Sequence, residues 1–157
     1  MNIKVRTMTC ADYPQVSALW RKIQGFAIRS IDDSEEGVAR FLRRNPDTCV
    51  VAEDVGSEDD RGRIVGSILC GSDGRFATFY HVCVDPDYRR MGIGRDMVNA
   101  CVEALRREQI NTIHLTAFRD NDLGNSFWSG MGWRKQENVN RNELKINAEN
   151  VTRFNQT

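Results

Sequence analysis

Apolar residues recur every three or four positions in four stretches of the chain, and this spacing predicts helices. The stretches cover residues 13–23, 35–44, 95–106 and 121–131. Shorter runs rich in β-branched and aromatic residues, which are typical of strands, cover 3–5, 49–52, 64–70, 76–84, 113–118, 133–136 and 144–146. This order predicts a mixed α/β (α+β) fold, in which a central, mostly antiparallel sheet of six to seven strands is flanked by about four helices. The helix that joins runs 76–84 and 113–118 makes those two strands parallel neighbours.

Composition narrows the classes of protein. The 157 residues suit one domain over 1–157, with a polar tail that we expect to be loosely ordered after about residue 148. Lys plus Arg equals Asp plus Glu at 22 each, and this balance argues against nucleic acid or an anionic membrane as a partner. The five scattered cysteines favour reduced, buried thiols in the cytoplasm, and they offer neither disulfide pairs nor a metal site.

A loop with two glycines follows the run that ends at Val84. Pro86 stops the strand, Gly92 and Gly94 lie in a cationic loop, and an amphipathic helix begins directly afterwards. Free N–H groups at a helix N-terminus attract anions, and glycine lets a ligand approach the backbone closely. The sequence therefore predicts a phosphate-binding loop.

Neither of the two commonest phosphate-binding patterns fits this loop. A P-loop requires Gly-Lys-Ser/Thr, which is absent. A dinucleotide loop requires a third glycine where Met97 stands, so a nucleotide enzyme is the weakest reading.

Two motifs resemble those of the GCN5-related N-acetyltransferase (GNAT) family. The order Arg89-x-x-Gly92-x-Gly94 after Val84-Asp85-Pro86 is similar to its acetyl-CoA pyrophosphate loop. Segment 121–133, with Asn121, Phe127, Gly132 and Trp133 at the corresponding places, is similar to its second motif. The resemblance covers essentially the whole chain and implies a splayed sheet of the GNAT type.

This resemblance implies acetyl-CoA (coenzyme A) as the cosubstrate. Residues Arg89, Arg90, Met91, Gly92, Ile93, Gly94 and Arg95 would hold the pyrophosphate, and Val82, Cys83 and Val84 would pair with the pantetheine arm. A backbone N–H at Val84 would face the thioester oxygen. Asn121, Phe127 and Trp128 complete the implied cofactor site.

The implied reaction is direct attack of a primary amine on the thioester. Family members usually carry a tyrosine acid where this chain has Trp128, and indole cannot supply a proton. Alternation along the strand puts Tyr80 on the face of Val82 and His81 on the opposite face. In similar enzymes of the family the residue two before the Val82 position often faces the acceptor, so the resemblance makes Tyr80 the first choice for an acceptor-side residue. A half-buried strand tyrosine with a satisfied hydroxyl is the equally weighted structural reading. His81 is a second candidate base, because imidazole changes its charge near neutral pH, but by the same parity it is favoured as a packed or interface histidine.

The acceptor amine, a small molecule or a peptide, would meet Ile31, Asp32 and Asp33 in the irregular segment before the second helix. Aspartates at such a place also serve as helix caps. Homodimers are common in the family. Because the usual tyrosine is missing, the alternative function is a non-catalytic acyl-CoA sensor or an inactive partner subunit.

Overall fold

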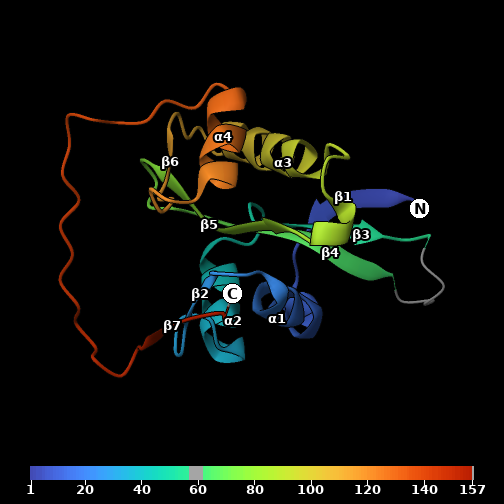
Figure 1. Cartoon of the computed structure of the whole chain (residues 1–157), viewed down its shortest axis with the longest axis horizontal. Coiled ribbons are helices and arrows are strands. Elements are labelled where there is room, and N and C mark those ends of the chain that lie inside the picture. Colours follow the sequence, from blue (N-terminus) through green and yellow to red (C-terminus); the bar gives the residue numbers. More distant parts are fainter. Residues whose placement is uncertain (57–61, 157) are drawn as a thin grey trace.

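The computed structural model describes residues 1–56 and 62–156, and its central sheet contains five strands (Figure 1). Their order across the sheet is β1 (Ile3–Thr7), β3 (Val50–Asp54), β4 (Arg63–Ser72), β5 (Ala77–Val84) and β6 (Ile113–Leu115). The first four pair antiparallel, whereas β5 and β6 pair parallel through the predicted helical crossover. The mixed α/β fold is therefore confirmed.

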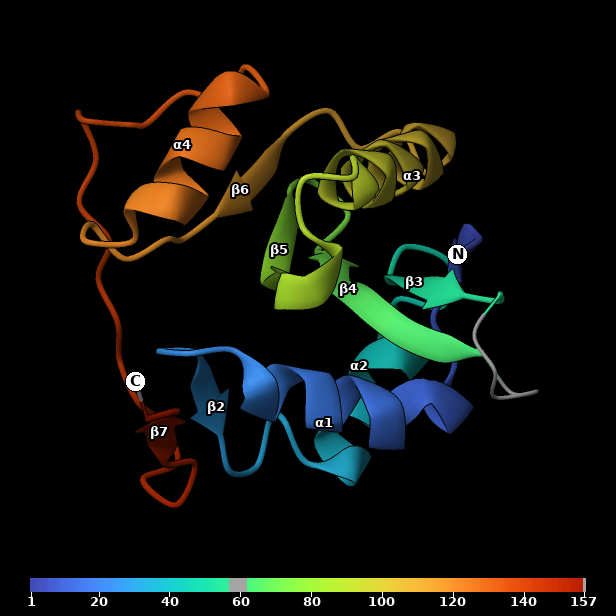
Figure 2. The same cartoon turned by 45° about the vertical axis from the view of Figure 1, so that its right-hand side comes forward.

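Helices cover both faces of this sheet. Figure 2 shows α3 (Ile93–Arg107) and α4 (Asp122–Gly130) on one side, and α1 (Tyr13–Lys22) and α2 (Glu35–Arg44) on the other. Short 3₁₀ turns, Cys10–Asp12 and Pro86–Tyr88, precede α1 and the phosphate-type loop. Each face has its own buried apolar cluster, one centred on Met97 and Val98 of α3, the other on Trp20 of α1 and Val38 of α2.

A second, two-stranded sheet joins the C-terminal segment to the acceptor-side loop, defined as residues 23–34 between α1 and α2, where the acceptor was expected from sequence. Strand β2 (Ala27–Arg29) pairs antiparallel with β7 (Thr152–Phe154), two strands that the hydrophobic pattern did not predict. Asn150 Oδ1 accepts hydrogen bonds from the backbone N–H groups of Ile31 and Asp32, at 3.0 and 3.2 Å. The segment expected to be a loose tail is thus held by backbone pairing and amide side chains, which carry no hydrophobic signal.

The expected closing pair of strands, 133–136 and 144–146, is not formed. Figure 1 shows the chain between α4 and β7 running outside the helical layers. Trp133 packs beside Phe79 and Trp128, but Leu144 and Ile146 are 87% and 95% exposed, so no contact favours an extended pair. β6 is also shorter than expected, because β5 and β6 stop pairing after Phe79 and Leu115.

Among residues 1–56 and 62–156, no helix has both the length and the apolar character needed to cross a membrane.

Candidate acyl-CoA site

The turn that enters the glycine loop is fixed by a buried carboxylate. Asp85, with a side chain only 3% exposed, accepts hydrogen bonds from Lys22 Nζ at 2.8 Å, from Arg63 at 3.1 Å and from the Asp87 N–H at 3.0 Å. Burial alone opposes ionisation, but the hydrogen bond from Lys22 and the nearby positive charges hold the pKa of Asp85 below its ordinary value. The Tyr88 hydroxyl donates to Asp54 Oδ2 at 2.9 Å and fastens the other end of the turn.

The loop itself presents backbone donors to the outside. Gly92 has φ of +81° and is the N-cap of α3, a conformation that glycine adopts without strain. In the part of the chain that the structure describes, the N–H groups of residues 89–95 donate no hydrogen bond to the protein. Arg89, Arg90 and Arg95 are exposed and form no ion pair with a described carboxylate. Together with the α3 dipole, these donors and charges form an anion-binding cradle.

An open strand edge adjoins this cradle. β5 pairs with β6 only as far as Phe79, so one side of residues 80–84 has none of the described strands beside it. Asp85 N–H donates to Val65 O of β4 at 2.7 Å. Because successive residues of a strand direct their N–H and C=O groups to opposite sides, those of Val84 point to the open edge. Arg89 Nε lies 3.3 Å from Val84 O at this edge.

The second motif packs directly on the cradle. A Cβ added at Gly94 would lie 3.1 Å from Phe127 Cζ, so the absence of a side chain lets α4 approach the start of α3. Trp128 is half-buried, with its ring centroid 4.9 Å from Phe127 and 4.8 Å from Trp133. Asn121 uses its side-chain oxygen to cap α4, accepting from the Gly124 N–H at 3.1 Å.

A bulge in β5 overturns the parity expected for Tyr80 and His81. Between the pairs Ser67–Cys83 and Leu69–Tyr80, one residue of β4 opposes two residues of β5, and His81 has φ of +51°. Tyr80 is 45% exposed, and its ring packs edge-to-face on the ring of Phe41 of α2, with the two centroids 5.9 Å apart. The imidazole of His81 packs on the indole of Trp20 of α1, with the ring centroids 4.7 Å apart. Both side chains therefore lie on the α1–α2 face, and the assignment of His81 to the face opposite Tyr80 was wrong.

The three acceptor-side residues expected from sequence lie near this bulge but differ in their surroundings. Asp33 is buried and its Oδ1 lies 2.8 Å from His81 Nε2, whereas Asp32 is exposed and accepts from Asn150 Nδ2 at 2.8 Å. Ile31 is half-buried, and its N–H is taken by Asn150. No sequence pattern indicated the role of Asn150, and the only hint of the bulge was a histidine, a residue type enriched at positive φ.

Taken together, the fold and the cradle beside an open strand edge define a protein of the acyl-CoA-binding type. The sequence model of the Acetyltransferase (GNAT) family matches residues 13–133. The chain belongs to the GNAT acetyltransferase family. The expectation of an acetyl-CoA-dependent N-acetyltransferase is thereby confirmed, with acetyl-CoA as the cosubstrate of this family.

Individual relatives agree with this assignment. The chain is 29% identical over 137 residues to a protein named acetyltransferase from Sodalis glossinidius, covering 87% of this chain and 91% of the relative. It is 31% identical over 120 residues to another from Pectobacterium atrosepticum, covering 76% and 79%. The structure of the PaiA N-acetyltransferase of Thermoplasma acidophilum, solved with coenzyme A, has the same fold with a TM-score of 0.71, 15% identity and full coverage of both chains.

Proposed function

We propose that the loop Arg89–Arg95 binds the pyrophosphate of acetyl-CoA and that the edge of Val82, Cys83 and Val84 binds its pantetheine arm. The observation that carries the proposal is the run of backbone N–H groups at residues 89–95 that donate to no described protein atom. Pantetheine contains two amides, so it can lie along the open edge of β5 as an added strand. Phe127 and Trp128 would flank it, and Asn121 would line the site while capping α4.

The chemistry that follows is attack of a neutral amine on the thioester carbon. The Val84 N–H, directed to the open edge, would donate to the thioester oxygen and stabilise the negative charge that develops there. Trp128 would shape the acyl pocket without transferring a proton. A thiolate with a solution pKa of about 8.5 leaves adequately without a general acid.

The acceptor amine, from a small molecule or a peptide, would approach from the α1–α2 face. Tyr80 is exposed there and would orient the amine or a water molecule. Asp32 is exposed and would attract a cationic amine, with Ile31 beside it. Asp33 is already paired with His81, so any effect on the acceptor would be indirect.

Calorimetric titration with acetyl-CoA tests the cofactor site. Gly92→Asp would place a carboxylate at the cradle and is expected to abolish binding. Gly74→Asp is the matched control, because Gly74 also has positive φ and open space around a Cβ, but lies in the β4–β5 turn. Unchanged affinity of the Gly92 variant would refute the loop assignment.

Release of free thiol across a panel of amines tests the reaction. We expect release with a polyamine, an aminoglycoside or a short peptide. Binding of acetyl-CoA with no release across a broad panel would instead support the sensor function.

We further propose that residues 1–157 act as one domain and that the exposed apolar side chains Val139, Leu144 and Ile146 belong to a homodimer contact. Replacing all three by serine would then leave a monomer in light scattering, whereas an unchanged mass would refute the contact. The free thiols, four of them buried, fit a reducing compartment such as the cytoplasm.

A further inference from the structure

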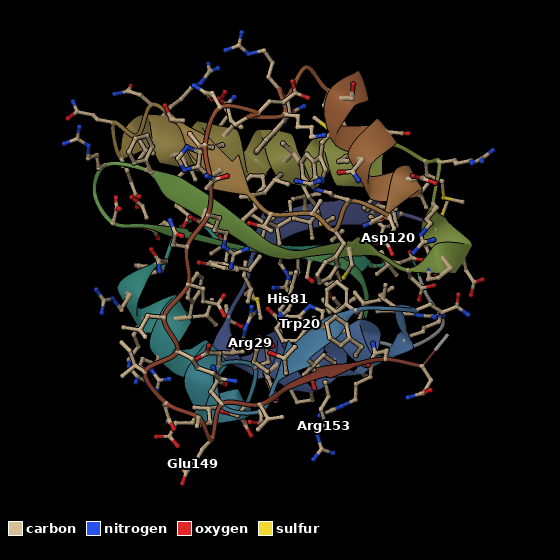
Figure 3. The ribbon with its side chains drawn as sticks, turned by 60° about the vertical axis from the view of Figure 1, so that its left-hand side comes forward. Trp20, Arg29, His81, Asp120, Glu149 and Arg153 are labelled. Carbon is tan, nitrogen blue, oxygen red and sulfur yellow. The ribbon has the colours of Figure 1, made fainter. Side chains whose placement is uncertain are left out.

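A buried histidine–carboxylate pair lies where β5 meets the acceptor-side loop. His81 and Asp33 have side chains only 10% and 6% exposed, and His81 Nε2 lies 2.8 Å from Asp33 Oδ1. Asp33 Oδ2 accepts from the Arg29 N–H at 2.6 Å. Figure 3 shows His81 and Trp20 between the central sheet and β2, with Arg29 beneath them. Each carboxylate oxygen of Asp33 therefore has a hydrogen-bond partner.

Neighbouring aromatic rings hold the imidazole in place. The Trp20 ring lies 4.7 Å from that of His81, and its indole N–H donates to Ser67 Oγ at 3.0 Å. The Phe26 ring contacts the imidazole at 4.8 Å. The ring orientation is thus set by three different elements, and it does not depend on a flexible surface side chain.

The second ring nitrogen remains open. An ionised carboxylate only accepts hydrogen bonds, so the proton between the two residues belongs to Nε2 and the Nδ1 lone pair is left free. Within residues 1–56 and 62–156, Nδ1 has no hydrogen-bond partner, and no buried side-chain nitrogen or oxygen lacks one. Nδ1 therefore reaches the surface, in the arrangement that suits a proton acceptor.

His81 also lies at a position on β5 where a proton acceptor could reach the incoming amine. It directly precedes Val82–Val84, at the point where β5 has parted from β6, and it shares the α1–α2 face with Tyr80. Consecutive Cα atoms are about 3.8 Å apart, so the imidazole begins one residue from the edge assigned to pantetheine.

We propose that His81 is the general base of the acetyl transfer and that Asp33 positions it, an inference that rests on the proposed function. His81 Nδ1 takes one proton from the incoming alkylammonium, directly or through water, and yields a neutral amine. The amine lone pair forms the C–N bond while the C–S bond breaks and its electron pair leaves on sulfur. The second N–H proton goes to the thiolate, and the imidazolium returns its proton to solvent.

Few charged groups face the imidazole of His81. Trp20 from α1 and Phe26 from the following loop are uncharged, and Asp33 is the one charged side chain among the described residues that contacts the ring. On β5, burial raises the pKa of the Cys83 thiol to about 11, so Cys83 stays neutral. The Tyr13 hydroxyl donates to the backbone carbonyl of Asp33 at 2.8 Å.

Turnover of the best amine from the panel, measured from pH 6 to pH 9, tests the base. His81→Asn, which tolerates the positive φ, is expected to lower kcat about 100-fold or more and to remove the acidic inflection of the pH profile. Asp33→Asn should lower kcat about 10-fold and alter the acidic limb of the pH profile, because the imidazole loses the carboxylate that orients it. His114→Asn, an exposed histidine of β6 stacked on Phe76, is the matched control and should change neither.

Ring nitrogen NMR of the wild-type protein gives a second readout that needs no acceptor and no variant. We expect the Nε2–H tautomer of His81 at pH 8, with Nδ1 as the titrating nitrogen. An Nδ1–H tautomer, or protonation of both nitrogens up to pH 9, would overturn the proposal. So would normal kcat and an unchanged pH profile in His81→Asn. If the wild-type protein did not bind acetyl-CoA in calorimetry, the proposed function itself would be refuted.

Discussion

Replacing Asp85 by asparagine isolates the charge that fixes the entrance to the glycine loop. The carboxylate is buried, but its partners Lys22 and Arg63 are 43% and 48% exposed. Hydrogen bonds between charged groups contribute about 1.5–3 kcal/mol each, and exposure of both cations reduces this contribution. We therefore expect Asp85→Asn to lower the free energy of unfolding by about 2–3 kcal/mol at pH 7.

The effect has a defined pH dependence. The folded-state pKa of Asp85 is lowered relative to the unfolded chain, so its stabilisation is present above the unfolded value of about 3.9. This stabilisation is lost as the pH falls through the lower folded value. The difference between wild type and Asp85→Asn should consequently be largest near pH 7 and shrink below about pH 4.

Urea unfolding followed by circular dichroism measures the free energy of unfolding. Calorimetry with acetyl-CoA at pH 7 measures the affinity of the glycine loop for the cofactor. We expect several-fold weaker binding together with the loss of stability. Asp87→Asn is the control, because that side chain is 77% exposed and 3.8 Å from Lys22, so it should shift stability by under about 0.5 kcal/mol. A stability difference independent of pH would show that the charge of Asp85 is not the cause. Unchanged affinity would show that the loop does not depend on this anchor.

Three further substitutions test the packing and the site. Met97→Ala should lower the free energy of unfolding in urea by about 2–5 kcal/mol, because Met97 is fully buried against Gly66. A decrease under about 1 kcal/mol would contradict the packing of α3 on β4. Ser34→Ala should cost about 1 kcal/mol by the same measurement, because Ser34 Oγ accepts from the Gly37 N–H at 3.0 Å, and no loss would mean that water replaces the cap. Trp128→Phe should weaken acetyl-CoA binding in calorimetry and leave the pH profile of turnover unchanged, whereas a lost ionisation would mean that Trp128 affects proton transfer.

The elements with a strong apolar period were predictable from sequence. The faces of α1, α2 and α3 and the buried runs of β3, β4 and β5 are those that the pattern indicated. The glycine loop also followed from local residues, because Gly92 and Gly94 act through backbone freedom and close approach at their own positions.

Features that depend on distant partners were not predictable. Strands β2 and β7 have only three residues each, too few to show an alternating pattern. Their pairing is anchored by Asn150, which lies more than a hundred residues from its partner Ile31 in the chain. The bulge at His81 depends on where β4 and β5 change register, which no local pattern reports. Of the expected pair, only 144–146 alternates between apolar and polar residues, and its apolar side chains Leu144 and Ile146 are exposed with no described neighbours to pack on.

The pairing of β2 with β7 also bears on the order of folding during synthesis. The backbone N–H of Asn155 donates to the carbonyl of Phe26, so this contact needs residues from both ends of the chain. Chains emerge from the ribosome N-terminus first, and α3 with its glycine loop can pack on the sheet before β7 is made. Closing so long a loop also carries an entropy cost that grows with its length. The two-stranded sheet beside the proposed acceptor site is therefore completed after the central sheet, because β7 is the last of the described strands to be made.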